Sequence, residues 1–249
     1  MLNKTRRTLT LIKGKSIDID PNYYKSSYEP ELDFDCLYCK NILTDSKEKD
    51  VWNRPIIESQ NFVVIPTLGA FLIGWLLIIS KMHYLCIGSL PDSLFPELIN
   101  LKRKVKYILN QTIGPTISFE HGPCSSYERA GSCIDHAHLH IVPTKIDLLK
   151  DLRKNFKIKK SDTIRESKKF FLQKRPYILY ENVNDNLFYF EVETLPSQYM
   201  RRLLAKKLNL YSKYDWRKHS EVKNIIATKD IISAYLKNKS SRGKNECTK

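Results

Sequence analysis

The chain has 249 residues, 42% of them hydrophobic, and a formal net charge of +15. This length and apolar content exclude an intrinsically unfolded chain, and they allow one domain with an extension or two small domains. The positive charge favours an anionic partner or substrate, although a lysine-rich surface alone would account for most of the excess. Six cysteines in a chain this long do not indicate a disulfide-built scaffold.

No segment predicts export or a membrane anchor. The longest apolar stretch, residues 70–79, is too short to span a bilayer, and Lys81 and His83 follow it. The first seven residues lack a long apolar run, so a secretory signal is not expected. We therefore expect a cytoplasmic protein with no membrane partner.

The first part of the chain predicts an α+β fold. After a polar arm over residues 1–32, apolar runs predict strands at residues 52–57, 62–66, 75–80, 116–120 and 133–142. A helix is expected from an N-terminal cap at Asp92 or Ser93 to Gly114, because large aliphatic residues recur at helical spacing between them. This order predicts a mainly antiparallel sheet with one long helix over residues 33–148.

Beyond Pro143 the composition shifts, and residues 150–175 hold eleven lysines or arginines against three acidic residues. Helices are expected at residues 146–155, 163–172, 196–208 and 228–236, and a hairpin at residues 177–180 and 187–192. We therefore predict a basic α/β extension over residues 149–238 that packs on the first domain. The lysine- and serine-rich residues 239–249 are expected to form a disordered tail.

Three of the six histidines, His136, His138 and His140, occupy alternate positions in one predicted strand. Alternate side chains of a strand leave the same face, so the three imidazoles are expected in a row. The apolar residues expected toward a core on the opposite face are Ala137, Leu139, Ile141 and Val142. Polar groups in such a strand favour chemistry over a merely solvated face.

Cys36 and Cys39 are separated by two residues, a spacing typical of metal ligands. Redox-active cysteines and two unrelated buried thiols are the alternatives. Tetrahedral zinc needs four nitrogen or sulfur ligands, and His83 and His136 are the natural third and fourth. We favour a structural zinc site that fixes the base of the histidine strand.

Four segments occur in an order typical of one family. Residues 136–142 alternate histidine with apolar residues, and residues 36–40 contain the cysteine pair. Residues 74–83 run from a glycine through an apolar strand to Lys81 and His83, and residues 119–132 lead through a glycine loop into the histidines. This set resembles the histidine triad (HIT) superfamily of nucleotide hydrolases and transferases, in its zinc-containing bacterial-type form, over residues 33–145. Residues 197–202 and 215–217 are similar to the C-terminal extensions of some HIT-like hydrolases.

The resemblance implies a HIT-like fold and a role for each histidine. His138 would be the nucleophile that attacks phosphorus and carries a covalent nucleotidyl intermediate. The N–H of its other ring nitrogen would donate a hydrogen bond to the backbone carbonyl of His136, which fixes the tautomer. His140 would bind a phosphate oxygen or assist the leaving group. Zinc-containing relatives bind the metal at the places of Cys36, Cys39, His83 and His136.

Substrate contacts are expected from the loop before the histidines and from the extension. Backbone N–H groups of residues 131–133 would stabilise phosphate charge, with Ser132 as a further donor or as an ordinary turn residue. A helix carrying Gln198, Arg201 and Arg202 would reach an anionic substrate, or present only a solvated face. The expected substrate-binding set is His121, Ser132, Cys133, Gln198 and Arg201.

The sequence departs from the family pattern at two positions. Pro66 lies where many members have a further histidine, which His121 would replace, and Ser132 lies where a glutamine is usual. Phosphate contacts are therefore expected to differ from those of relatives. Phe62, Val64 and Ile65 are candidates for the wall of a purine pocket, with an ordinary core as the alternative.

The sequence thus predicts a nucleotide hydrolase or nucleotidyl transferase. Its substrate would be a phosphoanhydride or phosphoramidate of a nucleoside phosphate, such as a dinucleoside polyphosphate. Two alternatives stay open: an enzyme acting on nucleic-acid ends through the basic surface, and a catalytically silent nucleotide- or RNA-binding protein. The superfamily resemblance also implies a homodimer, unless the extension covers that surface.

Overall fold

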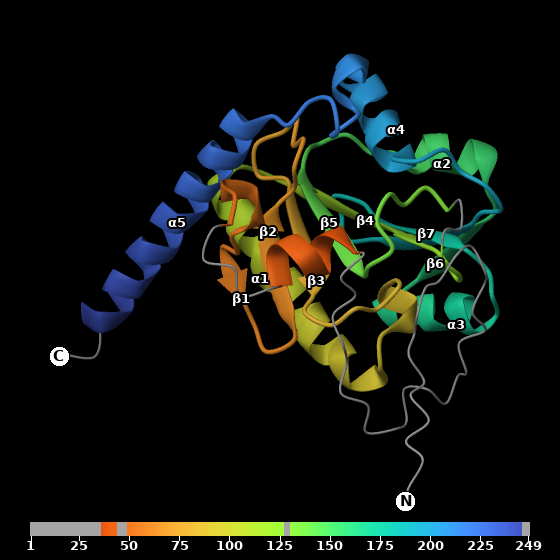
Figure 1. The fold of residues 1–249 in the computed structure, drawn as a ribbon, viewed down its shortest axis with the longest axis horizontal. Helices are drawn as coiled ribbons and strands as arrows, with labels where there is room; N and C mark the ends of the chain where they lie inside the picture. The colour runs from red at the N-terminus through yellow and green to blue at the C-terminus, as the bar shows by residue number, and fades with distance from the viewer. Residues whose placement is uncertain (1–35, 44–48, 127–129, 246–249) are drawn as a thin grey trace, which may run out of the picture.

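The fold is built on an eight-stranded sheet with the strand order β1-β2-β3-β5-β4-β7-β8-β6 (Figure 1). It is seen in a computed structural model that describes residues 36–43, 49–126 and 130–245. The predicted arm over residues 1–32 and the last four residues of the predicted tail lie outside these ranges. Every neighbouring pair of strands is antiparallel, which confirms the predicted α+β class.

The strands come from both halves of the chain. They are β1 (Ile57–Glu58), β2 (Phe62–Pro66), β3 (Leu76–Ser80), β4 (Thr116–Gly122), β5 (His138–Pro143), β6 (Ile158–Ser161), β7 (Tyr177–Glu181) and β8 (Leu187–Glu191). The helices are α1 (Phe95–Thr112), α2 (Leu149–Asn155), α3 (Ser167–Leu172), α4 (Tyr199–Lys207) and α5 (Val222–Asn245).

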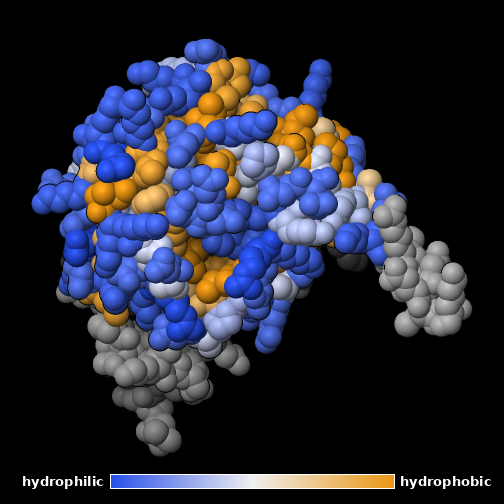
Figure 2. Space-filling view, turned by 180° about the vertical axis from the view of Figure 1, so that it is seen from behind, coloured by the Kyte–Doolittle hydropathy of each residue, from blue (hydrophilic) through white to orange (hydrophobic). Residues whose placement is uncertain are grey.

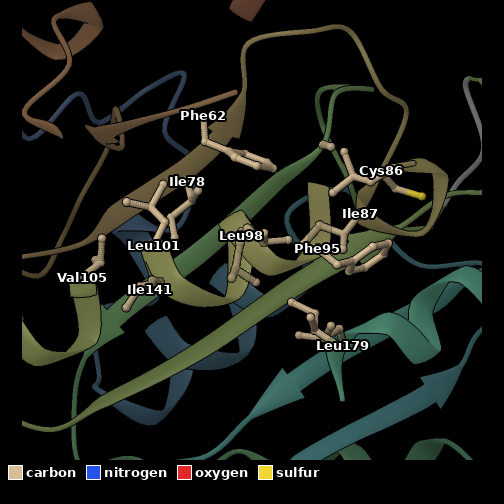
Figure 3. Close-up of a cluster of buried hydrophobic side chains, with 14 of the residues drawn as sticks. Phe62, Ile78, Cys86, Ile87, Phe95, Leu98, Leu101, Val105, Ile141 and Leu179 are labelled. Atoms are coloured by element: carbon tan, nitrogen blue, oxygen red, sulfur yellow. The ribbon is translucent and has the colours of Figure 1, made fainter. Parts of the chain in front are cut away.

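Helix α1 covers one face of the sheet. Its buried side chains recur at helical spacing, and Leu98, Leu101 and Val105 pack toward Ile78 of β3 and Ile141 of β5 (Figure 3). A Leu or Ile side chain buried in this way stabilises the fold by roughly 1.5–3 kcal/mol relative to its exposed state. This contact fixes which face of β5 belongs to the α1 core.

The register of β5 places its histidines on the other face. His138 pairs with Ile79 and His140 with Leu77 across β3, whereas Leu139 belongs to the α1 core. The predicted alternation is therefore correct for these two histidines. His136 precedes β5, so the strand begins later than the predicted residue 133.

Val142 is one of the four residues predicted opposite the histidines, and this prediction is wrong. It belongs to the second cluster of buried residues, on the histidine face, with Trp75 and Phe119. The parity of the strand explains the difference, because residues 138, 140 and 142 all point the same way. Both faces of the sheet are buried, and the histidines lie within a core rather than on an open surface.

The extension continues the sheet. Strand β7 pairs with β4 over five residue pairs, from Ser118 opposite Glu181 to Gly122 opposite Tyr177. Helices α2 and α4 lie over the histidine face of the sheet, where Leu152 and Leu204 join the second cluster (Figure 1). The free edge of β4 is thus covered by the same chain.

Several further elements differ from their predicted bounds. The predicted strand 52–57 forms only from Ile57, because a 3₁₀ turn occupies Val51–Asn53. The predicted helix 146–155 starts at Leu149, whose N–H is bonded to the Asp147 side chain at 2.9 Å. Helix α5 starts six residues before the predicted residue 228 and continues to Asn245, so residues 239–245 of the predicted disordered tail are helical.

The surface opposite the view of Figure 1 is mainly hydrophilic, with hydrophobic side chains in separate small areas (Figure 2). Among the residues that the structure describes, each helix is too short or too polar to cross a membrane.

We predict that the two halves of the chain unfold together. Ile178 of β7 is fully buried in the second cluster, so Ile178→Ala should lower the free energy of unfolding by about 2–5 kcal/mol. Urea unfolding, followed by circular dichroism and by tryptophan fluorescence, should show one transition at a lower midpoint. Ile226→Ala, at a 45% exposed position of α5, is the control and should change the midpoint little. Two separate transitions would contradict a shared core.

Candidate active site and metal centre

A cavity of about 200 Å³ opens on the histidine face of the sheet. His121, His138 and His140 line it from β4 and β5, and Gln198 and Arg201 line it from the extension. Its apolar and aromatic lining is Leu37, Tyr38, Ile42, Trp52, Ile65, Leu68, Leu77, Ile134 and Trp216. The sequence-predicted substrate-binding residues therefore lie around one cavity, with Ser132 and Cys133 at its loop.

His138 is held as a neutral ring with one defined tautomer. Its Nδ1–H donates to the backbone carbonyl of His136 at 2.5 Å, so Nε2 carries the lone pair. Burial lowers the pKa of His138 to about 4, which keeps the ring unprotonated at neutral pH. A buried imidazole with an available lone pair is a nucleophile for phosphorus.

His140 has the opposite tautomer. The indole Nε1–H of Trp75 donates to His140 Nδ1 at 3.1 Å, so the proton of the neutral ring lies on Nε2. The His140 ring also stacks on Phe119, with ring centroids 4.5 Å apart. Burial lowers the pKa of His140 well below its ordinary value. The His138 and His140 ring centroids are 5.1 Å apart, which places an acceptor and a donor side by side.

His121 lies at the end of β4 and connects the sheet to the extension. The backbone N–H of Met200, in the first turn of α4, donates to His121 Nε2 at 3.3 Å. Burial lowers the pKa of His121 to about 3. Gly131 has a φ of +89°, and a Cβ there would lie 2.6 Å from the His121 ring. A glycine is therefore required where the loop passes this ring.

The remaining predicted substrate-binding side chains are mostly engaged within the protein. The Ser132 hydroxyl donates to the carbonyl of Ile134 at 2.8 Å, and Cys133 Sγ lies 3.0 Å from Ser197 Oγ. The Gln198 amide donates to Asp215 at 2.9 Å. These side chains shape the cavity mainly by fixing its loops.

A second cluster lies beside the cavity. Cys36 Sγ is 3.5 Å from His136 Nδ1, and Cys39 Sγ is 3.5 Å from His83 Nδ1 and 3.6 Å from His136 Nδ1. All four candidate ligand atoms lie within 4.8 Å of one another. Zinc bound tetrahedrally at about 2.3 Å from sulfur and 2.05 Å from nitrogen separates S from N by about 3.6 Å. The four residues therefore fit zinc closely.

The surroundings of the cluster also suit a metal. His136 Nε2–H donates to the carbonyl of Ser80 at 2.8 Å, which leaves the Nδ1 lone pair directed at the cysteines. Hydrogen bonding from Cys39, followed by that from His136 and His83, lowers the pKa of Cys36, although burial opposes it. The thiolate that zinc requires is thus favoured.

The structure separates the roles of His136 from those of the other two histidines. Its ring belongs to the cysteine cluster, while its carbonyl holds His138. Tyr38, between the two cysteines, lies edge-on to the rings of both His136 and His138, at 5.7 and 5.4 Å. The cluster and the cavity therefore share a wall.

Sequence reasoning missed Tyr38, Trp75 and Ser80 as site residues. Tyr38 is one of the two residues between the cysteines, where the metal-ligand spacing places no requirement on residue type. Trp75 and Ser80 belong to an apolar run, which predicts only a buried strand. Of the three suggested purine-pocket residues, Ile65 lines the cavity. Phe62 and Val64 face the α1 core instead, since Phe62, Val64 and Ile78 belong to one cluster.

Comparisons with known proteins return matches to solved structures only. No family model and no curated protein matches the chain. The structures include a hypothetical histidine triad nucleotide-binding protein from Sulfolobus tokodaii, with 23% identity and a TM-score of 0.32, covering 36% of this chain and 59% of that one. A HIT family hydrolase from Clostridium thermocellum has 18% identity and a TM-score of 0.34, over 45% of this chain and 92% of that one. A zinc-bound histidine triad family protein from Mycobacterium smegmatis has 18% identity and a TM-score of 0.35, over 56% and 91%.

These structures carry the name of the family that the sequence motifs resemble. The chain spans 59% of the Sulfolobus protein, so less than two thirds of that chain is matched. The function proposed below rests on this chain's own side chains.

We predict about one zinc ion per chain, bound at the four-residue cluster. Cys36→Ser should lose the metal and lower the melting temperature, because the remaining ligands no longer close the tetrahedron. Elemental analysis by mass spectrometry and differential scanning calorimetry measure the two effects. Cys124→Ser, outside the cluster, is the control and should retain zinc. Full zinc occupancy in Cys36→Ser would exclude this ligand set.

We also predict that His138 and His140 are neutral at pH 7 in opposite tautomers. Their folded-state pKa values lie below the ordinary 6.5, so the neutral forms should persist as the pH falls from 7 to about 5. Long-range ¹H–¹⁵N NMR spectra should place the proton on Nδ1 of His138 and on Nε2 of His140. Titration of either ring near pH 6.5 would contradict this arrangement.

Proposed function

We propose that this chain is a nucleotide hydrolase or nucleotidyl transferase. It cleaves a phosphoanhydride or phosphoramidate of a nucleoside phosphate through a nucleotidyl intermediate on His138. The observation that supports this most is the pair of complementary histidines in one cavity, with a lone pair on His138 Nε2 beside a proton on His140 Nε2.

In the first step, the lone pair of His138 Nε2 forms a bond to the α-phosphorus. The bond from phosphorus to the leaving group breaks, and its electron pair goes to the leaving atom. A leaving oxygen departs as a phosphate anion, whereas a leaving nitrogen takes up a proton from solvent and departs as the neutral amine. The His138 ring becomes positively charged, and the His136 carbonyl that accepts its Nδ1–H stabilises this charge. His140 Nε2–H donates a hydrogen bond to a phosphoryl oxygen or to the leaving atom.

In the second step, water or another acceptor attacks the same phosphorus. The P–N bond breaks, its electrons return to His138 Nε2, and the acceptor loses a proton to solvent or to the released product. The neutral ring is restored in its original tautomer because the Nδ1–H bond to His136 is kept throughout. A hydrolase and a transferase differ here only in the acceptor.

Zinc would be held by Cys36, Cys39, His83 and His136, and its chemistry there would be structural. The four ligands leave no open coordination position for a substrate. The cluster holds the segment that carries the His136 carbonyl, and through it the orientation of His138. The Tyr38 ring, fixed between the two cysteine ligands, closes one side of the cavity.

A second candidate is an enzyme acting on nucleic-acid ends. The observation that favours it is the net charge of +15, together with the extension's Lys150, Arg153 and Lys154, which line a surface hollow with Asp147 and Leu149. Phosphate contacts of this kind weaken steeply as salt rises. Small nucleotides bound inside the cavity would respond less to salt.

We predict that His138→Ala keeps the fold but abolishes turnover of nucleotide conjugates, because the variant lacks the attacking nitrogen. Wild-type protein exposed briefly to a panel of dinucleoside polyphosphates and nucleotide phosphoramidates should gain the mass of one nucleotidyl group. The modified peptide should contain His138. His219→Ala, outside the cavity lining, is the control and should remain active.

Each result selects one function. Unchanged turnover in His138→Ala would refute the mechanism. Nucleotide binding without any adduct would indicate a catalytically silent protein. Adducts formed only with oligonucleotide ends, and lost as salt is raised, would favour the second candidate.

A further inference from the structure

Arg201 is a buried cation in the wall of the cavity. It is the third residue of α4, it is only 4% exposed, and it lines the same cavity as His138 and His140. Its guanidinium carbon lies 4.6 Å from the centre of the Trp75 ring and 5.4 Å from that of Phe71. Since Trp75 also donates to His140, a single side chain separates the cation from the proposed donor histidine.

The guanidinium is only partly satisfied by the protein. Nε donates to the carbonyl of Tyr214 at 3.0 Å, and Nη2 donates to the carbonyl of Gly69. Nη1 is buried and has no hydrogen-bond partner. Arginine presents its N–H groups in a planar fork, so two anchored nitrogens fix the direction of the third.

No carboxylate of the described residues forms an ion pair with this charge, although Asp215 acts on it from a longer distance and raises its pKa. Within the described part of the chain, no Asp or Glu oxygen comes within ion-pair distance of Arg201. Both of its protein acceptors are neutral carbonyls. Burial lowers the pKa of Arg201 only to about 10, so it remains charged at neutral pH. Burying a guanidinium that has no ion-pair partner and one unused N–H costs free energy, and a bound anion would offset that cost.

In the proposed mechanism, two of the side chains that line the cavity already contact the reacting phosphoryl group of the substrate. His138 Nε2 attacks it, and His140 Nε2–H donates to it or to the leaving atom. A second anionic group is needed to engage Arg201. The chemistry that supplies two neighbouring anions on one small molecule is a phosphoanhydride chain.

We propose that Arg201 binds a second phosphate of the substrate, next to the reacting one, and so selects nucleoside phosphoanhydrides over nucleotide phosphoramidates with neutral leaving groups. This inference rests on the proposed function of the same cavity. It assigns to the C-terminal extension a direct part in substrate choice, because α4 carries the arginine.

Binding of matched probes tests this selection. The probes are the four ribonucleoside 5′-monophosphates and their methylene-bridged 5′-diphosphates, which cannot be cleaved at the P–C–P link. Wild-type protein should bind one diphosphate about 10- to 100-fold more tightly than its monophosphate, the range expected for one charge-assisted hydrogen bond. Arg201→Met should lose that preference, while its affinity for the monophosphate changes by less than about 3-fold.

Arg202→Met is the matched control on the same helix. Arg202 donates to the carbonyl of Ser197 and lies over the Tyr214 ring, outside the cavity lining. It should keep the wild-type preference for the diphosphate. Equal loss of both probes in a folded Arg201→Met protein, or an unchanged preference, would overturn the inference.

Arg201 also ties down two loops, so calorimetry must accompany each variant. If Arg201→Met does not fold, arginine side-chain ¹⁵N NMR of the wild-type protein decides instead. One guanidinium signal should shift with the diphosphate and not with the monophosphate, and no such shift would overturn the inference. If wild-type protein forms the His138 adduct but Arg201→Met keeps the preference for the diphosphate, only this inference is overturned. Absence of any adduct in wild-type protein would remove the proposed function itself.

Discussion

The hydrogen bond from His138 Nδ1 to the carbonyl of His136 is the contact on which the site depends. It defines which nitrogen of His138 carries the lone pair, and it ties that nitrogen to the backbone of a cluster residue. The ring of His136 faces Cys36 and Cys39 while its carbonyl faces His138. One residue thus couples the cysteine cluster to the cavity, so the position of His138 depends on the integrity of the cluster.

The extension completes the cavity as well as the sheet. Strand β7 covers the edge of β4, and the first turn of α4 reaches His121 through the Met200 N–H. Gln198, the N-cap residue of α4, and Arg201 belong to the same turn. The region before residue 148 alone would leave β4 with an unpaired edge and the histidine face without its cover of α2 and α4. Residues 149–238 therefore act as part of the fold rather than as an appended module.

Local patterns in the sequence predicted much of this architecture. The spacing of apolar residues gave the long helix, and alternation placed His138 and His140 on one face, because both depend on backbone geometry alone. The pairing of β7 with β4 was not predictable, since strand pairing between distant segments leaves no local pattern. The same is true of Tyr38 and Trp75, whose roles arise from what lies beside them. His136 was misplaced in the strand because alternation in sequence does not show where a strand begins.

Charge illustrates the difference between a surface and a site. The chain carries a net charge of +15, and most of the lysines in the described residues are exposed, so their fields are weakened by solvent and salt. Arg201 is one cation among many in the composition, yet burial removes it from that screening and leaves its Nη1 without an acceptor. Its field also helps to keep His140 unprotonated, after burial and the neighbouring histidines. A single buried arginine thus influences the protonation of the site, and under our proposal it also selects the charge of the substrate.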